Sequence, residues 1–308
     1  MGLFRSIYFG QPLIRPSFRK TNSLNSGDVW DDKSLLILIM LRYSLMVALS
    51  ILVISSCQVK NSKKAIDSYS LVWSDEFDYA GLPDSTKWGY EVGGSGWGNN
   101  ELQYYTDADT LNAVVKNGRL FITARKVDIG HRRYSSARLS TKGKAEWTYG
   151  KIEINAKLPS GRGLWPASWM LGVNINKVGW PESGEIDIME HVGFSRDSIF
   201  GTVHTLAYNH IKGTQKGTTT LIKNPYNQFH TYSIEWTPEK IDFMLDHKVF
   251  YTVMNEHKTE AEWPFDQPFF LLLNIAVGGN LGGMKGVDET VFPAVMEVDY
   301  VRIYQANK

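Results

Sequence analysis

Apolar and polar side chains alternate along several short segments between residues 119 and 304, which is typical of strands that bury one face. The cleanest alternation runs over residues 149–158, where Ile152, Ile154 and Ala156 occupy every second position. The other segments predicted to be strands are, in chain order, residues 119–125, 199–205, 230–236, 240–245, 249–254, 269–276 and 296–304. Residues 246–248 lie between two of these and predict a hairpin turn.

The folded region is expected to run from residue 69 to residue 305, without an internal repeat, a linker or a long helical period. Many short strands separated by glycine, proline and asparagine predict an all-β domain, either a sandwich or a barrel. A two-sheet sandwich with a concave, polar face would hold an extended polymer. The strand pattern by itself does not choose between the two architectures.

The N-terminal part of the chain has a different pattern. Residues 34–56 form an apolar stretch that Arg42 interrupts. A transmembrane helix needs about 20 apolar residues and rarely keeps an arginine inside the membrane. A signal peptide that starts at Met40 fits better, because Arg42 supplies its basic region, residues 45–54 its apolar region, and small residues precede Cys57.

Cys57 is the only cysteine, so the chain can form no intramolecular disulfide. Residues 54–57 resemble a bacterial lipobox, which implies cleavage before Cys57 and a lipid on its sulfur. The alternative is an incidental thiol at the end of a membrane helix. We expect an exported lipoprotein of the outer membrane or cell surface, or otherwise a periplasmic or secreted protein. The expected divisions are a mis-called start or an extension over residues 1–39, a signal peptide over 40–56, a tether over 57–68 and one folded domain over 69–308.

The composition limits the kinds of molecule that the protein is expected to bind. The formal net charge is +1, which argues against a nucleic-acid partner, because such a protein carries a basic surface. The chain has 10 Trp, 15 Tyr and 14 Phe, enough for some rings to stack on an uncharged ligand instead of filling the core. No oligomeric contact is indicated, and a monomer is expected.

An acidic cluster lies in residues 184–193, which read GEIDIMEHVG. On a strand, Glu185 and Asp187 project to one face because side chains alternate. Glu190 follows Glu185 by five positions, which in a regular strand would place it on the opposite face. A one-residue bulge near Met189 would return Glu190 to the same face.

Three carboxylates in a row repel one another, so the pKa of at least one of them rises. A retaining glycosidase needs such a pair, one carboxylate ionised as nucleophile and one protonated as acid, about 5–5.5 Å apart. Two other interpretations stay open at this point. The cluster could be a solvated acidic strand edge that discourages aggregation, or a calcium site.

Residues 185–190 resemble the signature of glycoside hydrolase family 16 in its laminarinase-like form, which has the extra residue that Met189 supplies. The resemblance extends from residue 71 to residue 304 through several motifs, among them 97–106, 149–172, 201–204 and 296–304. It implies a β-jelly-roll sandwich of two antiparallel sheets with a concave substrate cleft over the catalytic domain, residues 69–308. It also implies retaining endo-hydrolysis of β-1,3-glucosidic bonds in laminarin-like β-glucans, with no cofactor required for the chemistry.

The resemblance implies that Glu185 is the nucleophile, Asp187 its partner and Glu190 the general acid/base. The residues that it implies for substrate binding are Asn100, Arg138, Trp165, Trp169, Trp180 and His204, with His204 beside Glu190 or a sugar hydroxyl. For the tryptophans the alternative is core packing, for Arg138 an ion pair with a sheet carboxylate, and for His204 a structural role. The chain departs from the family at Leu281, where many laminarinases have tryptophan, which puts the preference of one subsite in doubt.

Many family members also hold a structural Ca²⁺, and Glu76, the backbone of Gly118 and Asp299 occupy matching positions. Ordinary surface carboxylates are the alternative. Two other functions remain in view: a hydrolase of the same fold that acts on agar, carrageenan or mixed-linkage glucan, and a surface glucan-binding protein without catalysis. The presence of both Glu185 and Glu190 favours hydrolysis over binding alone.

Overall fold

The computed structural model describes residues 69–307. The predictions for residues 1–68, including the signal peptide, the tether and Cys57, lie outside the described residues. None of the helices in residues 69–307 has the length and apolar character that crossing a membrane requires.

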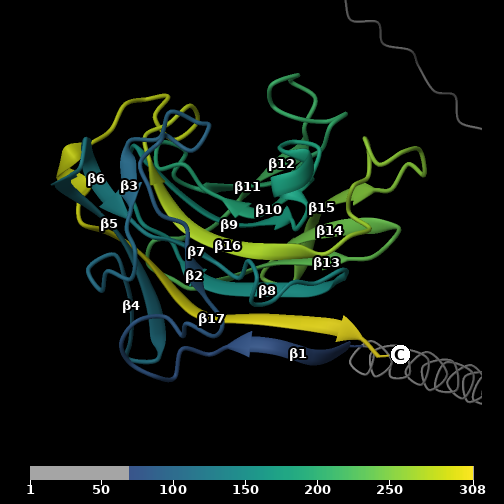
Figure 1. Cartoon of the computed structure of the whole chain (residues 1–308), viewed down its shortest axis with the longest axis horizontal. Coiled ribbons are helices and arrows are strands. Elements are labelled where there is room, and N and C mark those ends of the chain that lie inside the picture. The colour runs from purple at the N-terminus through teal and green to yellow at the C-terminus, as the bar shows by residue number, and fades with distance from the viewer. Residues whose placement is uncertain (1–68, 308) are drawn as a thin grey trace, which may run out of the picture. The chain divides into compact units, whose positions relative to one another are not determined.

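The described residues form two twisted sheets, drawn in Figure 1. The larger sheet has ten strands: in order β15 (Lys248–Met254), β14 (Lys240–Leu245), β13 (His230–Trp236), β8 (Gly150–Lys157), β17 (Ala294–Ala306), β5 (Arg119–Ile129), β6 (Arg132–Ser136) and β3 (Gln103–Tyr105), with β1 (Tyr69–Asp75) on β17 and β4 (Ala113–Lys116) on β5. The smaller has seven: β12 (Lys216–Leu221), β11 (Ser198–His204), β10 (Glu185–Glu190), β9 (Leu164–Gly172), β16 (Phe269–Val277), β7 (Arg138–Ser140) and β2 (Gly89–Tyr90).

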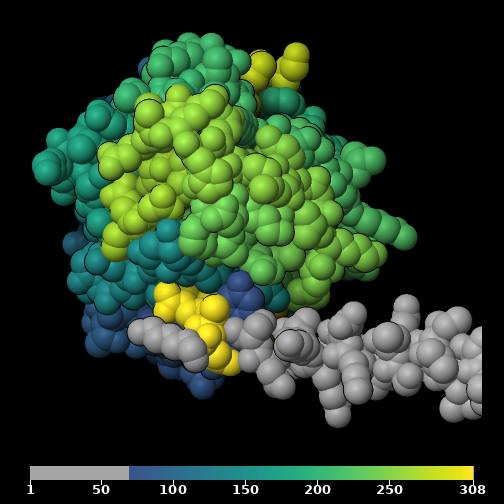
Figure 2. All heavy atoms as spheres, turned by 90° about the vertical axis from the view of Figure 1, so that its right-hand side faces the viewer, coloured from purple at the N-terminus to yellow at the C-terminus, as the bar shows by residue number. Residues whose placement is uncertain are grey.

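Almost every strand pair is antiparallel, and the pair β3–β6 is parallel. The described helices are α2 (Ile175–Val178) and the 3₁₀ turn η1 (Glu289–Val291). The predicted all-β sandwich is thus confirmed, and the choice between sandwich and barrel is settled. Figure 2 shows the C-terminal residues beside the first described residues, because β1 pairs along the end of β17 with Tyr69 opposite Ala306.

The core lies between the two sheets. On β8 the predicted inward residues Ile152, Ile154 and Ala156 are fully buried. Strand β16 is buried at every position. Alternate side chains pack in the core, and the others lie on the opposite surface of the sheet, which points away from the core. On that opposite surface Phe270 and Leu272 form a second, small apolar cluster.

The alternation predicted the long strands well. The segments 230–236 and 240–245 coincide with β13 and β14, and the hairpin turn between β14 and β15 is present, with positive φ at Asp246 and His247. Two positive φ values fit a type I′ turn, which matches the twist of the flanking strands. The strands that alternation did not predict are β1, β2, β3, β4, β6, β7, β9 and β12. Most of these are too short for a periodic signal, while β9 is buried on both faces and reads as a nearly continuous apolar run.

Candidate active site

A β-bulge on β10 brings three carboxylates to one surface. From Asp187 to Met189 the strand advances two residues while its neighbour β9 advances one, and the pairing with β11 shifts at the same place. Ile188 and Met189 are both buried in the core. The bulge absorbs the odd spacing, and Glu190 lines the same cavity as Glu185.

The three carboxylates line a cavity of about 330 Å³. It lies over β9, β10 and β16, on the face of the seven-stranded sheet that points away from the core. Its aromatic lining consists of Trp97, Trp165, Trp169 and Trp180. A cavity of this size with indole walls and a few polar groups suits an uncharged ligand that has apolar faces.

His204 on β11 lies against the first two carboxylates of the row. Its Nε2 is 3.4 Å from Asp187 Oδ2 and 3.8 Å from Glu185 Oε1. The resemblance predicted a place beside Glu190 or a sugar hydroxyl, but the strand register pairs His204 directly with Glu185. These three side chains also have ligand atoms within 4.8 Å of one another, the spacing that a shared cation would need.

Burial raises the pKa of each carboxyl group in the row. For Glu185 the negative charge of Asp187 adds to the effect of burial, while the proximity of His204 and Arg138 opposes it. For Asp187, burial and then the charge of Glu190 raise the pKa. The row therefore holds protons more tightly than free carboxyl groups do, and its protonation is shared among coupled neighbours.

Trp165 contacts Glu190 through a single directed bond. The indole Nε1–H donates to Glu190 Oε1 at 2.9 Å. This bond favours the charged form of Glu190 and partly offsets the rise in pKa that burial causes. Trp165 therefore fixes the side chain of Glu190 and adjusts its acidity, in addition to lining the cavity.

Arg138 lies at the other side of the cavity, between two indole rings. Its guanidinium carbon is 4.6 Å from the ring centres of both Trp97 and Trp169, and its Nε forms an ion pair with Glu91 at 2.8 Å. The ion pair was foreseen as an alternative to sugar binding. In the structure Arg138 forms this ion pair and also lies in the cavity wall, so an ion pair with Glu91 is compatible with sugar binding.

Behind Trp169 runs a buried chain of hydrogen bonds. The indole donates to Asn274 Oδ1 at 2.7 Å, Asn274 donates to the Tyr105 hydroxyl at 2.9 Å, and that hydroxyl donates to Glu101 at 3.3 Å. Burial raises the pKa of Glu101, which also accepts a bond from Gln103. This network holds the ring of Trp169 in the cavity wall, so the indole does more than pack the core.

Several cavity residues were not predicted from the sequence: Trp97, Glu101, His210, Ile211 and Asn274. Trp97 and Glu101 lie in or beside the motif at residues 97–106, so the motif was a usable signal for them. His210 and Ile211 belong to the loop after β11, where the sequence offers no periodicity. Asn274 sits in the apolar strand β16, where one polar residue among buried neighbours could have been noticed.

Asn100 lies outside the cavity lining. Its side chain donates to Asn280 Oδ1 at 2.8 Å, which joins its loop to residues 278–283, where Leu281 replaces the tryptophan of many laminarinases. Both asparagines are solvent-accessible at this junction. Asn100 remains a predicted binding residue, and its observed contact is to the neighbouring loop.

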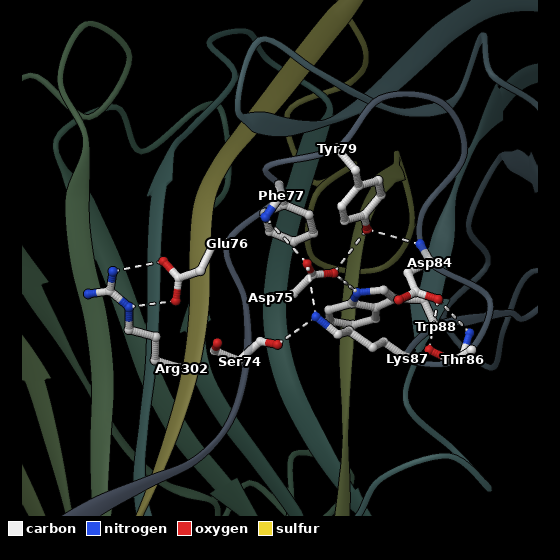
Figure 3. A network of polar contacts seen from close by, with 10 residues as sticks. All are labelled: Ser74, Asp75, Glu76, Phe77, Tyr79, Asp84, Thr86, Lys87, Trp88 and Arg302. Carbon is white, nitrogen blue, oxygen red and sulfur yellow. Dashed lines mark hydrogen bonds and ion pairs between the residues drawn. The ribbon is translucent and has the colours of Figure 1, made fainter.

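The carboxylates predicted for calcium are engaged by arginines. Glu76 forms a two-point ion pair with Arg302, at 2.9 and 2.8 Å, as Figure 3 shows. Asp299 pairs with Arg119 at 3.4 Å, next to Gly118 in the chain. The guanidinium groups already compensate both negative charges, so this arrangement does not fit a calcium ion.

Known proteins resemble the chain over most of its described length. The family model described as glycosyl hydrolases family 16 matches residues 97–302, which include the whole carboxylate row. A second family model, Beta-glucan synthesis-associated protein SKN1/KRE6/Sbg1, matches residues 7–186 and ends before Asp187 and Glu190.

A relative and a solved structure from Rhodothermus marinus are similar to this chain over nearly their full length. A beta-glucanase is 54% identical over 264 residues, which cover 83% of this chain and 92% of the relative. The X-ray structure of a laminarinase is 55% identical with a TM-score of 0.77, covering 78% of this chain and 98% of that one. The crystal structure of a non-specific endo-β-1,3(4)-glucanase is 47% identical with a TM-score of 0.74, covering 78% of this chain and 92% of that one.

Proposed function

The chain belongs to glycosyl hydrolase family 16, and from this premise we propose that it cleaves β-1,3-glucosidic bonds inside laminarin-like β-glucans with retention of configuration. One observation carries the proposal: the bulged strand β10 presents Glu185, Asp187 and Glu190 to a single tryptophan-lined cavity. A neutral polymer fits indole walls, because the C–H faces of glucose stack on the rings.

In the first step the carboxylate of Glu185 attacks the anomeric carbon and forms a covalent ester. The bond from that carbon to the leaving oxygen breaks, and Glu190 donates its proton to that oxygen. Burial raises the pKa of Glu190, which favours the protonated form that this step requires.

In the second step Glu190, now a carboxylate, accepts a proton from water as the water oxygen attacks the anomeric carbon. The ester bond to Glu185 breaks, and the second inversion restores the original configuration. Both steps use only side chains, substrate and water, so the chemistry requires no cofactor.

Asp187 and His204 decide which carboxylate carries charge. Protonated Asp187 can donate a hydrogen bond to Glu185, and His204 faces both groups at 3.4 and 3.8 Å. Burial and the negative charge of Asp187 raise the pKa of Glu185, and His204 opposes this rise. A proton on Asp187 removes its repulsion, so both neighbours then favour the ionised form of Glu185. Asp187 and His204 are positioning residues in this scheme.

Release of reducing ends from laminarin tests the proposal. The wild-type protein should release them, and Glu185→Ser should abolish release while thermal unfolding shows an intact fold. A matched control is Glu182→Ser, which changes a carboxylate three residues away that lines a separate cavity. A wild-type protein that binds laminarin without turnover would make it a glucan-binding protein instead.

Mixed-linkage β-glucan is a second candidate substrate. The 47% identical relative is described as a non-specific endo-β-1,3(4)-glucanase, and Leu281 changes the loop that carries a tryptophan in many laminarinases. A panel of laminarin, mixed-linkage glucan, agarose and carrageenan separates the candidates. We expect laminarin to give the largest kcat/KM. A larger value for another polymer would make that polymer the preferred substrate instead.

We also propose that the protein is exported and anchored to a membrane by a lipid on Cys57. Support comes from the basic, apolar and small-residue regions that precede the single cysteine. One acyl chain binds membranes weakly, whereas several chains on one cysteine anchor stably. Mass spectrometry of the membrane fraction should find a lipidated N-terminal Cys57, and a soluble, full-length, unlipidated chain would refute the anchor.

A further inference from the structure

The residue that follows Glu190 is a buried histidine, which the proposed chemistry does not use. His191 is fully buried and does not line the cavity that Glu190 lines. A polar ring in the interior costs free energy unless its nitrogens find hydrogen-bond partners. The partners of His191 therefore indicate what its ring does for the structure.

One ring nitrogen joins the end of β10 to the start of β11. The pairing of these strands reaches Glu190 and Phe200, and β10 ends there. Beyond this pair, the Nδ1–H group of His191 donates to the carbonyl oxygen of Ser198, the first residue of β11, at 2.8 Å. The side chain therefore takes the place of a further backbone bond between the two strands.

The other ring nitrogen faces Tyr226, in the segment between β12 and β13. The Tyr226 hydroxyl lies 3.1 Å from His191 Nε2 and also contacts the carbonyl oxygen of Arg196. Burial lowers the pKa of His191, which favours a neutral ring with its proton on Nδ1. Nε2 is then free to accept the hydrogen of the hydroxyl, and the ring cannot turn without losing a partner at one end.

The backbone of His191 is fixed on the opposite side, to β9. Its amide donates to the carbonyl oxygen of Pro166 at 3.1 Å. The preceding residue of β9 is Trp165, whose indole donates to Glu190 at 2.9 Å. His191 therefore attaches the chain next to Glu190 both to β11 and to the strand segment that carries the hydrogen-bond partner of Glu190.

Glu190 needs this support because it follows the bulge. The pairing of β10 with β11 shifts between Asp187 and Glu190, and a bulge locally interrupts the ladder and bends the strand. The ladder then resumes for one pair before the strand ends, which would leave Glu190 weakly held without His191. A displacement of about 1 Å at a catalytic group can cost about 10²-fold in rate.

We propose that His191 is a positioning residue for the general acid/base: its ring and its amide together hold the backbone so that the carboxyl group of Glu190 stays on the Trp165 indole. The inference rests on the proposed function and adds to it the group that places the proton donor. His191 acts through Glu190 and touches neither the substrate nor the reacting atoms. Its loss should therefore affect proton transfer and leave attack by Glu185 intact.

Two substrates with different leaving groups test this role. One is a β-1,3-linked glucose oligosaccharide, whose leaving sugar oxygen needs a proton from Glu190. The other is the 2,4-dinitrophenyl β-glycoside of a β-1,3-linked disaccharide, whose leaving phenolate needs none. For His191→Leu, which removes both ring contacts at similar volume, we expect kcat/KM to fall about tenfold or more on the oligosaccharide and less than about twofold on the dinitrophenyl glycoside.

The second step gives an independent readout. With the dinitrophenyl glycoside the breakdown of the ester limits kcat, and there Glu190 acts as base, so kcat of His191→Leu should also fall. Azide attacks without a general base and should restore kcat. His191→Asn, whose amide can still donate to Ser198, should recover most of the loss, and Tyr226→Phe should show a smaller loss with the same dependence on the leaving group.

His230→Leu is the matched control. His230 on β13 is also buried, and its two ring nitrogens lie 2.8 Å from Asp246 and from the carbonyl oxygen of Lys223. This variant should lower the unfolding temperature but leave the ratio of the rates on the two substrates unchanged.

Equal losses on both substrates in folded His191→Leu, no loss on either, or a kcat that azide does not restore would overturn the inference while the hydrolase assignment stands. A wild-type protein that acts on neither substrate would instead remove the proposed function and the inference together. If His191→Leu does not fold, Tyr226→Phe, a change at a partly exposed side chain, decides the question by the same ratio of rates.

Discussion

Two buried aspartates show how differently this fold treats the same side chain. Asp75, at the end of β1, is 1% exposed, and Asp187, in the middle of β10, is 4% exposed. Asp75 accepts bonds from the Trp88 indole at 2.8 Å and the Tyr79 hydroxyl at 3.0 Å, with Lys87 at 3.4 Å (Figure 3). Asp187 lies among carboxylates, and its buried Oδ2 makes no hydrogen bond.

The difference separates a structural carboxylate from a functional one. A buried charge whose lone pairs are matched by donors stabilises the fold, since removing it leaves those donors unpaired. A buried carboxylate beside like charges costs stability and persists because the chemistry needs it. The sequence placed Asp187 in an acidic cluster, but it gave no sign of which donors, if any, would reach either buried carboxylate.

Glu190→Gln should have the largest effect on the functional side. The amide keeps the shape of the side chain but can neither give a proton to the leaving oxygen nor take one from water, so we expect turnover on laminarin to fall about 10³-fold. Met189→Leu keeps the bulge and a similar volume, so it should retain near-normal turnover. A folded Glu190→Gln variant with near-normal turnover would show that Glu190 is not the general acid/base.

Asp75→Asn should have the largest effect on the structural side. The amide keeps the shape but turns one acceptor into a donor that faces Trp88, Tyr79 and Lys87, so the free energy of unfolding should fall by about 3 kcal/mol. Urea unfolding measures this, and kcat of the folded fraction should stay unchanged. A variant as stable as the wild type would remove the contrast between the two aspartates.

Asp187→Asn should have the reverse effect of Asp75→Asn, with lower turnover and higher stability. Turnover falls about 10²-fold because Glu185 loses its partner. Burial raises the pKa of Asp187 in the folded state. The free energy of unfolding therefore falls as the pH rises above the unfolded pKa of about 3.9, because the unfolded chain then ionises more readily than the folded protein. The variant should therefore be more stable than the wild type at pH 7, and this gain should disappear near pH 3. Equal or lower stability at pH 7 would mean that the charge of Asp187 is well compensated.

The smallest expected effect is that of Trp165→Phe. Loss of the indole bond to charged Glu190 raises the pKa of Glu190, so the basic limb of the kcat profile should move to higher pH. Turnover at the optimum should fall less than tenfold, because the ring still lines the cavity. A basic limb that moves to lower pH, or stays in place, would show that a group other than Glu190 carries the catalytic proton.

The sequence alone predicted the features of the fold and the site that depend on local pattern. Alternation identified β13 and β14, and the odd spacing from Glu185 to Glu190 required the bulge that β10 contains. The parts that depend on distant segments were not predictable. The sandwich of Arg138 between Trp97 and Trp169 joins three segments far apart in the chain, and no periodicity relates them.

The contact of His204 shows the same limit. A motif placed the residue near the carboxylates, but only the strand register decides that it faces Glu185 and Asp187. The network around Asp75 likewise joins side chains from β1 and the loop that follows it, up to Trp88. Hydrogen-bond saturation, which distinguishes the two aspartates, is a property of the folded structure.

Trapping the covalent intermediate tests the central claim most directly. The wild-type protein is incubated with an activated 2-deoxy-2-fluoro β-1,3-linked oligosaccharide, which forms the ester but releases it slowly, and is then digested and analysed by mass spectrometry. We predict one added glycosyl group, located on Glu185, in the peptide that contains residues 184–193. A label on Asp187 or Glu190, or turnover of laminarin without any label, would contradict the assignment of Glu185 as nucleophile.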